Sequence, residues 1–201
     1  MRGLLVDFGG VLTTNVFDSF RAFCTDEGLD PDAIKRLFKD EPEALRLVRA
    51  LETGALSEDE FGERFGDLLG VERHAGLVGR MFARVRPDET MLDAVRRARA
   101  RGVRTGLVSN SMGEGRYGRA TFPELFDGVV ISGEEGVHKP QREIFVLGAE
   151  RVGLRPEECV FVDDLRENCA GAEAVGMTAV LHRGADSTLP RLEELLGVAL
   201  R

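Results

Sequence analysis

The sequence has few cysteines and no long apolar run. Its three cysteines, Cys24, Cys159 and Cys169, show neither CxxC spacing nor the density of a disulfide scaffold. We therefore expect small buried thiols in a reducing compartment. No apolar run approaches the roughly 18–20 residues that a membrane-spanning helix needs. Asp7 also interrupts the N-terminal apolar segment early, which argues against a signal peptide. These absences predict a cytoplasmic protein.

Basic residues are also fewer than acidic residues. The chain has 27 Lys and Arg against 35 Asp and Glu, which gives a net charge of −8. General affinity for nucleic acid or for an anionic membrane is therefore not expected, and an anionic substrate would need a local site. The 201 residues can form one good core, or a core and a small second unit. Nothing in the sequence indicates the oligomeric state.

Apolar periodicity divides the chain into two parts. Residues 16–86 show helical spacing and no convincing strand, and Ser57–Glu60 has the spacing of a capping box. From Pro87 onward, helices alternate with short apolar strands. We expect strands, including the one before Asp7, at residues 4–6, 103–108, 129–131, 159–162 and 178–181.

Strands that alternate with helices imply parallel pairing and right-handed crossovers. The first strand is separated from the others by the helical block, so we interpret that block as an insertion. The predicted fold is α/β, a Rossmann-like three-layer sandwich with a mostly parallel sheet. Its core comprises residues 1–15 and 87–201, and residues 16–86 form an all-α insertion after the first strand.

Polar residues follow four of these strands. Asp7 ends the first strand and is followed by Gly9 and Gly10, which allow a sharp turn. The other clusters are Ser109-Asn110, Lys139-Pro140 at the start of the helix after the third strand, and Asp163-Asp164. Each has an ordinary explanation as a helix cap, a turn or a solvated lysine. However, the carboxyl ends of parallel strands meet at one edge of the sheet, where α/β folds bind ligands. Together the four clusters predict a single site.

In these residues the chain resembles the haloacid dehalogenase (HAD) superfamily of phosphatases and related hydrolases. The matching motifs are Asp7-Phe-Gly-Gly-Val-Leu, Val108-Ser-Asn110, Lys139-Pro140 and Phe161-Val-Asp-Asp164, followed by Asn168 and Gly171-Ala172. The resemblance covers nearly the whole chain. It implies that residues 16–86 form the small cap domain found in this superfamily.

The resemblance also implies roles for the site residues. Asp7 is then the nucleophile that takes the phosphoryl group, and Lys139 neutralises the nucleophile and the phosphate. The other implied phosphate-binding residues are Phe8, Gly9, Ser109 and, through its backbone N–H, Asn110. The implied ligands of Mg²⁺ are Asp7, the Gly9 carbonyl and one of Asp163 and Asp164, of which we favour Asp164.

These roles agree with elementary chemistry. An aspartate cannot approach a phosphate dianion unless positive charge lies between them, and Mg²⁺ held by oxygen ligands supplies it together with a lysine. Covalent capture on Asp7 divides one difficult hydrolysis into two easier steps. We therefore predict a Mg²⁺-dependent phosphatase that acts on a small phosphorylated metabolite, for example a sugar phosphate.

Gly9 departs from the pattern of the superfamily, whose phosphatases usually carry a second aspartate two residues after the nucleophile. That aspartate protonates the leaving alcohol and then activates water, a contribution of about 10²–10⁴-fold. Three explanations remain open. First, the substrate has a leaving group that needs little protonation, as in an anomeric sugar phosphate or an acyl phosphate. Second, His74 or His138 replaces the missing aspartate as acid and base. Third, the chain is a catalytically weak member.

Other functions are less well supported. A 2-haloacid dehalogenase needs no metal, whereas Asp163-Asp164 indicates a metal site. A mutase needs the acid/base that Gly9 lacks. A non-catalytic phosphate-binding module would not need a nucleophile. The GxGxxG pattern at 113–118 resembles a dinucleotide-binding motif, but its glycines begin several residues after the strand and Pro123 limits the following helix.

Overall fold

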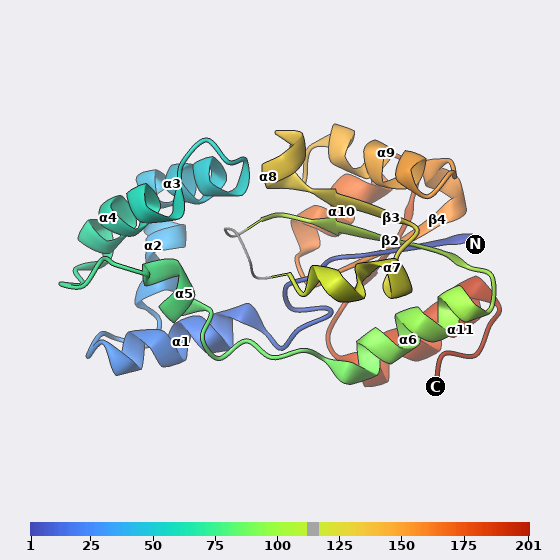
Figure 1. The fold of residues 1–201 in the computed structure, drawn as a ribbon, viewed down its shortest axis with the longest axis horizontal. Coiled ribbons are helices and arrows are strands. Elements are labelled where there is room, and N and C mark those ends of the chain that lie inside the picture. The colour runs from blue at the N-terminus through green and yellow to red at the C-terminus, as the bar shows by residue number, and fades with distance from the viewer. Residues whose placement is uncertain (112–116) are drawn as a thin grey trace.

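The computed structural model describes residues 1–111 and 117–201. Five parallel strands form one sheet in the order β3-β2-β1-β4-β5 (Figure 1). The strands are β1 (Gly3–Val6), β2 (Arg104–Ser109), β3 (Gly128–Ile131), β4 (Cys159–Asp163) and β5 (Thr178–Leu181). The first strand is central and lies between β2 and β4. The predicted α/β fold with a parallel sheet is confirmed.

Helices cover both faces of the sheet. The helices on one face are α6 (Glu89–Ala100), α7 (Phe122–Leu125) and α11 (Ala185–Leu196), and those on the other are α8 (Ser132–Glu135), α9 (Arg142–Arg151) and α10 (Arg166–Glu173) (Figure 1). Side chains of a strand alternate between the faces. Leu4 and Val6 accordingly pack in the core under α6 and α11, whereas Leu5 packs in the core under α9. These are the three predicted layers.

Residues 16–86, which we call the helical unit, contain no strand and pack around a core of their own. Their helices are α1 (Val16–Asp26), α2 (Ala33–Asp40), α3 (Pro42–Glu52), α4 (Glu58–Leu69) and α5 (Leu77–Met81). Phe61 and Phe65 stack at the centre of this core, with ring centroids 4.8 Å apart. The predicted capping box at Ser57 and Glu60 starts α4.

Two neighbouring segments join the helical unit to the sheet. Thr14 N donates to Arg86 O at 2.8 Å, and Asp88 N donates to Leu12 O at 2.9 Å. The outgoing and returning chains therefore run antiparallel at this connection.

The structure differs from the sequence prediction at several boundaries. Helix α9 begins at Arg142, so Lys139 and Pro140 lie in the turn before it and do not open it. The four-residue helix α8 was not predicted, because one turn is too short to show a 3.6-residue period. Most of the 113–118 GxGxxG segment lies outside the described residues. No helix in the described chain is long and apolar enough to cross a membrane.

Candidate active site

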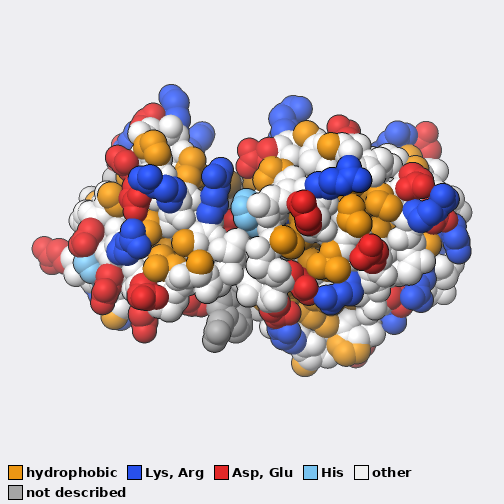
Figure 2. All heavy atoms as spheres, turned by 90° about the horizontal axis from the view of Figure 1, so that it is seen from above, with side chains coloured by type: hydrophobic (Ala, Val, Ile, Leu, Met, Phe, Trp, Pro, Cys, Tyr) orange, Lys and Arg blue, Asp and Glu red, His pale blue; other side chains and the backbone are white. Residues whose placement is uncertain are grey.

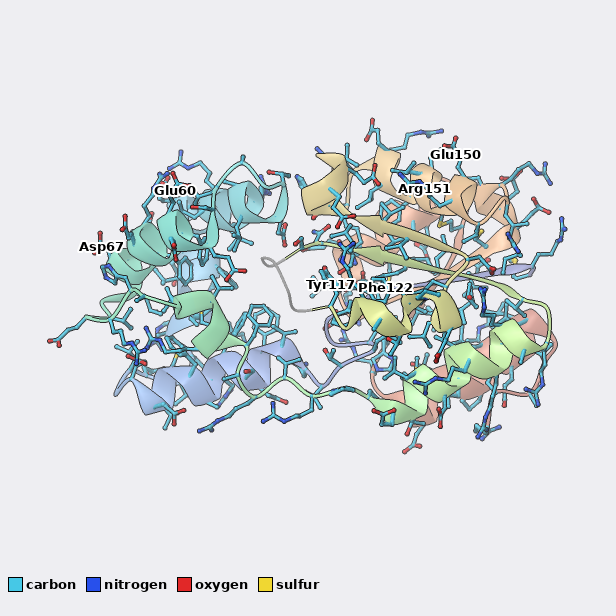
Figure 3. All side chains as sticks on the ribbon, in the orientation of Figure 1. Glu60, Asp67, Tyr117, Phe122, Glu150 and Arg151 are labelled. Carbon is cyan, nitrogen blue, oxygen red and sulfur yellow. The ribbon has the colours of Figure 1, made fainter. Side chains whose placement is uncertain are left out.

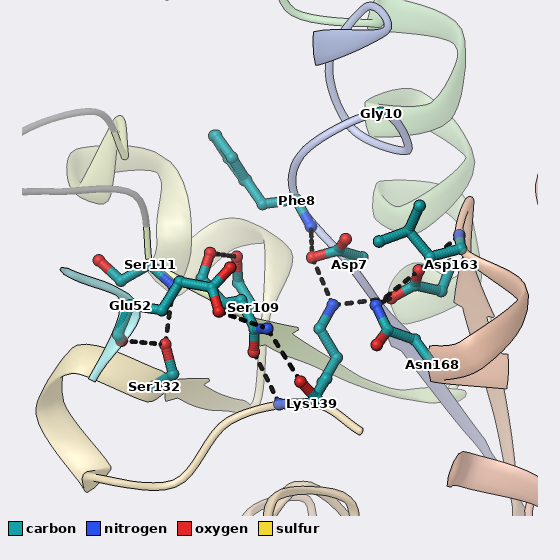
Figure 4. A network of polar contacts seen from close by, with 12 residues as sticks. Asp7, Phe8, Gly10, Glu52, Ser109, Ser111, Ser132, Lys139, Asp163 and Asn168 are labelled. Carbon is teal, nitrogen blue, oxygen red and sulfur yellow. Dashed lines mark hydrogen bonds and ion pairs between the residues drawn. The ribbon is translucent and has the colours of Figure 1, made fainter. Parts of the chain in front are cut away.

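The register of the sheet brings the predicted clusters to one edge. Val6 of β1 is paired with Leu107 of β2 and with Val162 of β4. Asp7 therefore lies beside the ends of β2 and β4, where Ser109 and Asp163 are located. Figure 4 shows these side chains gathered at the ends of their strands. We call the group formed by Asp7, Ser109, Asn110, Lys139, Asp163 and Asp164 the site rim.

Lys139 joins two carboxylates at the centre of the rim. Its side chain is almost fully buried, and its Nζ lies 2.7 Å from Asp7 Oδ1 and 2.7 Å from Asp163 Oδ2 (Figure 4). Burial alone would lower the pKa of this ammonium, but the carboxylates of Asp163 and Asp7 outweigh burial and raise the pKa above its usual range. Lys139 is thus a fixed positive charge and not the solvated surface lysine that its sequence position also allows.

The two adjacent aspartates have different surroundings. Asp163 is fully buried and accepts hydrogen bonds from Lys139 Nζ, from Asn168 Nδ2 and from the backbone N–H of Leu165. Its oxygens are therefore occupied by donors of the protein. Asp164 lines the adjoining cavity, whereas Asp163 does not. This arrangement leaves the carboxylate of Asp164 accessible to a bound ion.

The rim has the composition of a site for a hard divalent cation. Oxygen atoms of Asp7, Asp163 and Asp164 all lie within 4.8 Å of one another. Three carboxylates against the single ammonium of Lys139 leave two negative charges uncompensated. Burial is the main cause that raises the pKa of Asp7 to about 7 and that of Asp164 to about 6. A cation would stabilise both ionised groups, so the residues present fit Mg²⁺.

Phe8 and Asn110 add further hydrogen bonds at the rim. The backbone N–H of Phe8 donates to Asp7 Oδ1 at 2.7 Å. Asn110 contacts the Lys139 backbone: its Oδ1 accepts from the Lys139 N–H at 2.8 Å, and its Nδ2 donates to the Lys139 carbonyl at 3.2 Å. These contacts hold the turn that carries Lys139 against the end of β2.

Tyr117 is a site residue that the sequence analysis missed. Its hydroxyl lies 2.9 Å from Ser109 Oγ, and its ring packs on Phe8 with centroids 4.8 Å apart. Figure 3 shows it next to Phe122 at the approach to α7. Burial raises the pKa of this phenol to about 12, so it remains protonated. Tyr117 is the one tyrosine of the chain, but nothing in its local pattern indicates that it reaches Ser109.

A cavity of about 790 Å³ lies between the rim and the helical unit. Figure 2 shows these two parts of the molecule meeting along a hollow, with charges of both signs scattered over the surface. The rim contributes Asp7, Ser109, Asn110, Lys139 and Asp164 to the lining. The helical unit contributes mainly apolar side chains, together with Glu52 at the end of α3. Glu52 was not identified from the sequence.

The two candidate histidines occupy different places. His74 Nε2 lies 3.0 Å from Val71 O and 3.4 Å from Asp67 Oδ1, and it does not line the cavity. Figure 3 labels Asp67 at the end of α4 that points away from the sheet. His74 is therefore not the substitute acid/base. His138 does line the cavity, and its Nδ1 lies 2.8 Å from the Lys139 carbonyl.

Comparison with known proteins places these features in a family. The chain is 34% identical over 108 residues to a glyceraldehyde 3-phosphate phosphatase of Methanopyrus kandleri, covering 51% of this chain and 46% of that protein. It is 27% identical over 151 residues to the sesquiterpene phosphatase astK of Aspergillus oryzae, covering 73% and 77%. The chain spans less than half the length of the first curated relatives that it matches.

The fold is also shared with a solved structure. The HAD family enzyme bt-2542 of Bacteroides thetaiotaomicron, in complex with magnesium and inorganic phosphate, superimposes with a TM-score of 0.67 at 20% identity. The match covers 92% of this chain and 96% of that one. Residues 1–176 match the family model of haloacid dehalogenase-like hydrolases. The chain belongs to the haloacid dehalogenase-like hydrolase family.

Proposed function

We propose that the chain is a Mg²⁺-dependent phosphatase that hydrolyses a small phosphorylated metabolite through an aspartyl-phosphate on Asp7. The observation that carries the proposal is the contact of Lys139 Nζ with both Asp7 and Asp163, beside a third carboxylate, Asp164. This arrangement provides a nucleophile, a fixed cation and a site for a divalent ion in one buried cluster. The phosphatase relatives support the same reaction class.

Each rim residue has a defined task in this reaction. An oxygen of Asp7 attacks phosphorus, and Lys139 balances the charge of the nucleophile and the phosphate. The Ser109 hydroxyl and the backbone N–H groups of Phe8 and Asn110 orient the phosphate oxygens. Asp7, Asp164 and the Gly9 carbonyl would hold Mg²⁺, which would supply further positive charge. Phosphoryl transfer depends mainly on such positioning and neutralisation.

The helical unit is proposed to act as a cap, with its boundaries at residues 16 and 86. It lines the cavity opposite the rim, and as a cap it would exclude water and large substrates. The three cysteines are free and buried, which supports the proposal of a cytoplasmic location.

A phosphate-binding module without turnover is the second candidate. A binding module has no need for a buried nucleophile in contact with a lysine, so the geometry favours the enzyme. A dehalogenase is a weaker alternative, because it has no use for the three clustered carboxylates. Both alternatives predict that no phosphoenzyme forms.

Single-turnover labelling with an activated acyl or aryl phosphate tests the proposal. We expect one acid-stable, base-labile phosphoryl group on Asp7, formed only with Mg²⁺ present. Asp7→Asn should abolish labelling and turnover, whereas Asp18→Asn, on the exposed face of α1, should change neither. Turnover that survives Asp7→Asn would disprove the assignment of the nucleophile.

A further inference from the structure

The wall of the cavity opposite the rim is apolar. The helical unit contributes to this wall Phe17, Phe20, Phe38, Leu45, Val48 and Phe82. The charged residues that the same unit adds to the described lining are Arg49, Glu52 and Arg86. Arg86 donates from its guanidinium to the carbonyls of Ala83 and Val85. Most of the wall therefore cannot form hydrogen bonds with a ligand.

Two members of this wall are unusually accessible for large apolar side chains. Phe17 is 37% exposed and Leu45 is 40% exposed, although both line a cavity. The ring of Phe17 packs edge-on against Phe20 and Phe38, with centroids 5.8 and 6.4 Å away. An apolar ligand would cover these surfaces, whereas a polyhydroxylated ligand would lose hydrogen bonds to water without replacing them.

We propose that the substrate is a phosphate monoester of an alcohol with an extended hydrocarbon body. The phosphate would bind at the rim, and the hydrocarbon would lie against Phe17, Phe38 and Leu45. The cavity of about 790 Å³ is within the range that encloses ligands much larger than phosphate alone. This substrate class rests on the proposed phosphatase function. It restricts the expected substrates to phosphate esters of apolar alcohols and excludes sugar phosphates.

A homologous series of n-alkyl phosphates tests the substrate class. From butyl through hexyl and octyl to decyl phosphate, kcat/KM should rise about fourfold for each added methylene that is buried. Glucose 6-phosphate and sorbitol 6-phosphate should be poorer substrates than hexyl phosphate. A flat series, or a preference for the sugar phosphates, would overturn this substrate class.

Two exposed leucines provide matched variants. Leu45 lines the cavity, whereas Leu68, on α4 and 36% exposed, does not. Leu45→Asn should lower kcat/KM for decyl phosphate about tenfold and flatten the dependence on chain length. Leu68→Asn should leave both unchanged, and equal effects of the two variants would contradict the proposal. Hydrolysis of an aryl phosphate tests the proposed phosphatase function separately from the substrate class. The phosphatase function is disproved only if no phosphate ester is hydrolysed.

A second observation concerns Glu52, which ends α3 at the joint between the helical unit and the rim. Its backbone carbonyl accepts a hydrogen bond from Ser132 Oγ, and its carboxylate accepts one from Asn110 Nδ2 at 3.3 Å. Figure 4 shows this carboxylate above the end of β2, beside Ser109. The Glu52 carboxylate is therefore held next to Asn110, which is one of the residues proposed to bind the phosphate.

The surroundings of Glu52 favour a carboxyl group that carries a proton near neutrality. Burial raises its pKa to about 7, although Lys139, the Asn110 amide and Arg49 act in the opposite direction. Glu167 of α10 is the other nearby charge and favours the protonated form. His138 lines the same cavity.

We infer that Glu52 is the acid and base that replaces the carboxylate missing at Gly9. As Asp7 attacks, the bond between phosphorus and the alcohol oxygen breaks, and that oxygen takes the proton of Glu52. The resulting Glu52 carboxylate then takes a proton from water while the water oxygen displaces Asp7 from phosphorus. The products are the alcohol, inorganic phosphate and the original enzyme.

The test compares a leaving group that needs a proton with one that does not. In Glu52→Gln, kcat/KM for octyl phosphate, relative to that for p-nitrophenyl phosphate, should fall about 10²-fold or more. The limb of the octyl phosphate pH profile that falls toward high pH should also disappear. Glu63→Gln, which changes an exposed carboxylate of α4 that does not line the cavity, should alter neither.

Rescue distinguishes catalysis from a structural effect. Among the described residues, a β-carbon at Gly9 would approach Val16 Cγ2, at 3.2 Å, which requires this methyl group to shift by a few tenths of an ångström. Gly9→Asp should therefore restore octyl phosphate hydrolysis in the Glu52→Gln protein. The inference is wrong if Glu52→Gln lowers both substrates equally, or if its pH profile is unchanged. Labelling of Asp7 by an aryl phosphate would show that the proposed function nevertheless stands.

Discussion

A β-carbon at Gly10 would lie 2.8 Å from Cγ of Asp164, closer than any real contact of that kind. The turn after β1 and the carboxylate after β4 therefore fit together only because residue 10 has no side chain. Gly10 also has a φ of +74°, a conformation that glycine adopts at little cost. Gly10 thus makes a left-handed turn and leaves room for the Asp164 carboxylate at the proposed cation site.

Gly10→Ala should weaken the binding of Mg²⁺ about tenfold or more, because the added methyl group displaces the Asp164 carboxylate. Titration calorimetry or a magnesium-dependent thermal shift measures this effect. Gly28→Ala is the matched control, since Gly28 has a φ of +73° and no atom within 4 Å of an added β-carbon. Both variants should lose about 1–2 kcal/mol of stability through backbone strain. Weaker Mg²⁺ binding in both would show that strain, not the contact with Asp164, is responsible.

The affinity for Mg²⁺ should depend on pH in the direction set by two carboxyls. Burial raises the pKa of Asp7 to about 7 and that of Asp164 to about 6, above the usual value of 3.8. The folded protein without metal therefore binds more protons than the unfolded chain. The contribution of these groups to the free energy of unfolding falls as pH rises from about 4 to about 7.

Cation binding requires both carboxylates to be ionised, so the affinity for Mg²⁺ should increase as the pH rises. The increase in Tm caused by a fixed concentration of Mg²⁺ should be small at about pH 5 and should grow until about pH 8. Asp164→Asn should remove most of this increase. A Tm increase that is the same across this range would mean that the ion does not bind at the rim.

The sequence was informative where charge interrupts an apolar run. Asp7, Ser109 and Asp163 end short buried strands, and parallel pairing places all three at one edge without further information. Lys139 was also placed in the predicted site, but its burial and its contacts with two carboxylates were not predictable, because they depend on the turn before α9. Local patterns therefore gave the fold and most of the rim.

Residues that reach the site through tertiary packing were not predictable. Glu52 lies 58 residues before its partner Asn110, on a helix whose docking against the sheet has no sequence signal. Its position at the end of an amphipathic helix is typical of solvated glutamates. His74 and His138 were equivalent as sequence candidates, and only the fold separates them. The apolar cavity wall is likewise made of residues that each resemble ordinary core positions.

Tyr117→Phe should reduce catalysis without removing the packing of the ring on Phe8. The variant loses the hydroxyl that lies 2.9 Å from Ser109 Oγ. A single hydrogen bond contributes about 0.5–1.5 kcal/mol, so kcat/KM should fall about two- to tenfold. Tyr117→Leu also loses the ring and should fall further. If Tyr117→Phe matches the unmodified protein in single-turnover labelling of Asp7, the hydroxyl does not orient Ser109.

Lys139→Met should abolish labelling of Asp7 and destabilise the fold, because Asp7 and Asp163 lose the ammonium that lies 2.7 Å from each. Removal of one partner of a buried ion pair costs about 3–5 kcal/mol. Urea denaturation measures this loss. The loss should be greatest at about pH 8 and shrink toward about pH 5, since Asp7, whose pKa burial raises to about 7, then takes up a proton and no longer needs a counter-charge.

Two further variants separate this effect from a general loss of charge. Arg104→Met breaks the contact of Arg104 with Asp127, but the arginine side chain is 52% exposed, so less than about 1 kcal/mol should be lost at any pH. Lys139→Met combined with Asp163→Asn removes one buried charge of each sign and should recover part of the stability at about pH 8, without recovering labelling. A loss in Lys139→Met that does not vary with pH would mean that the missing lysine chain, and not the unpaired carboxylates, destabilises the protein.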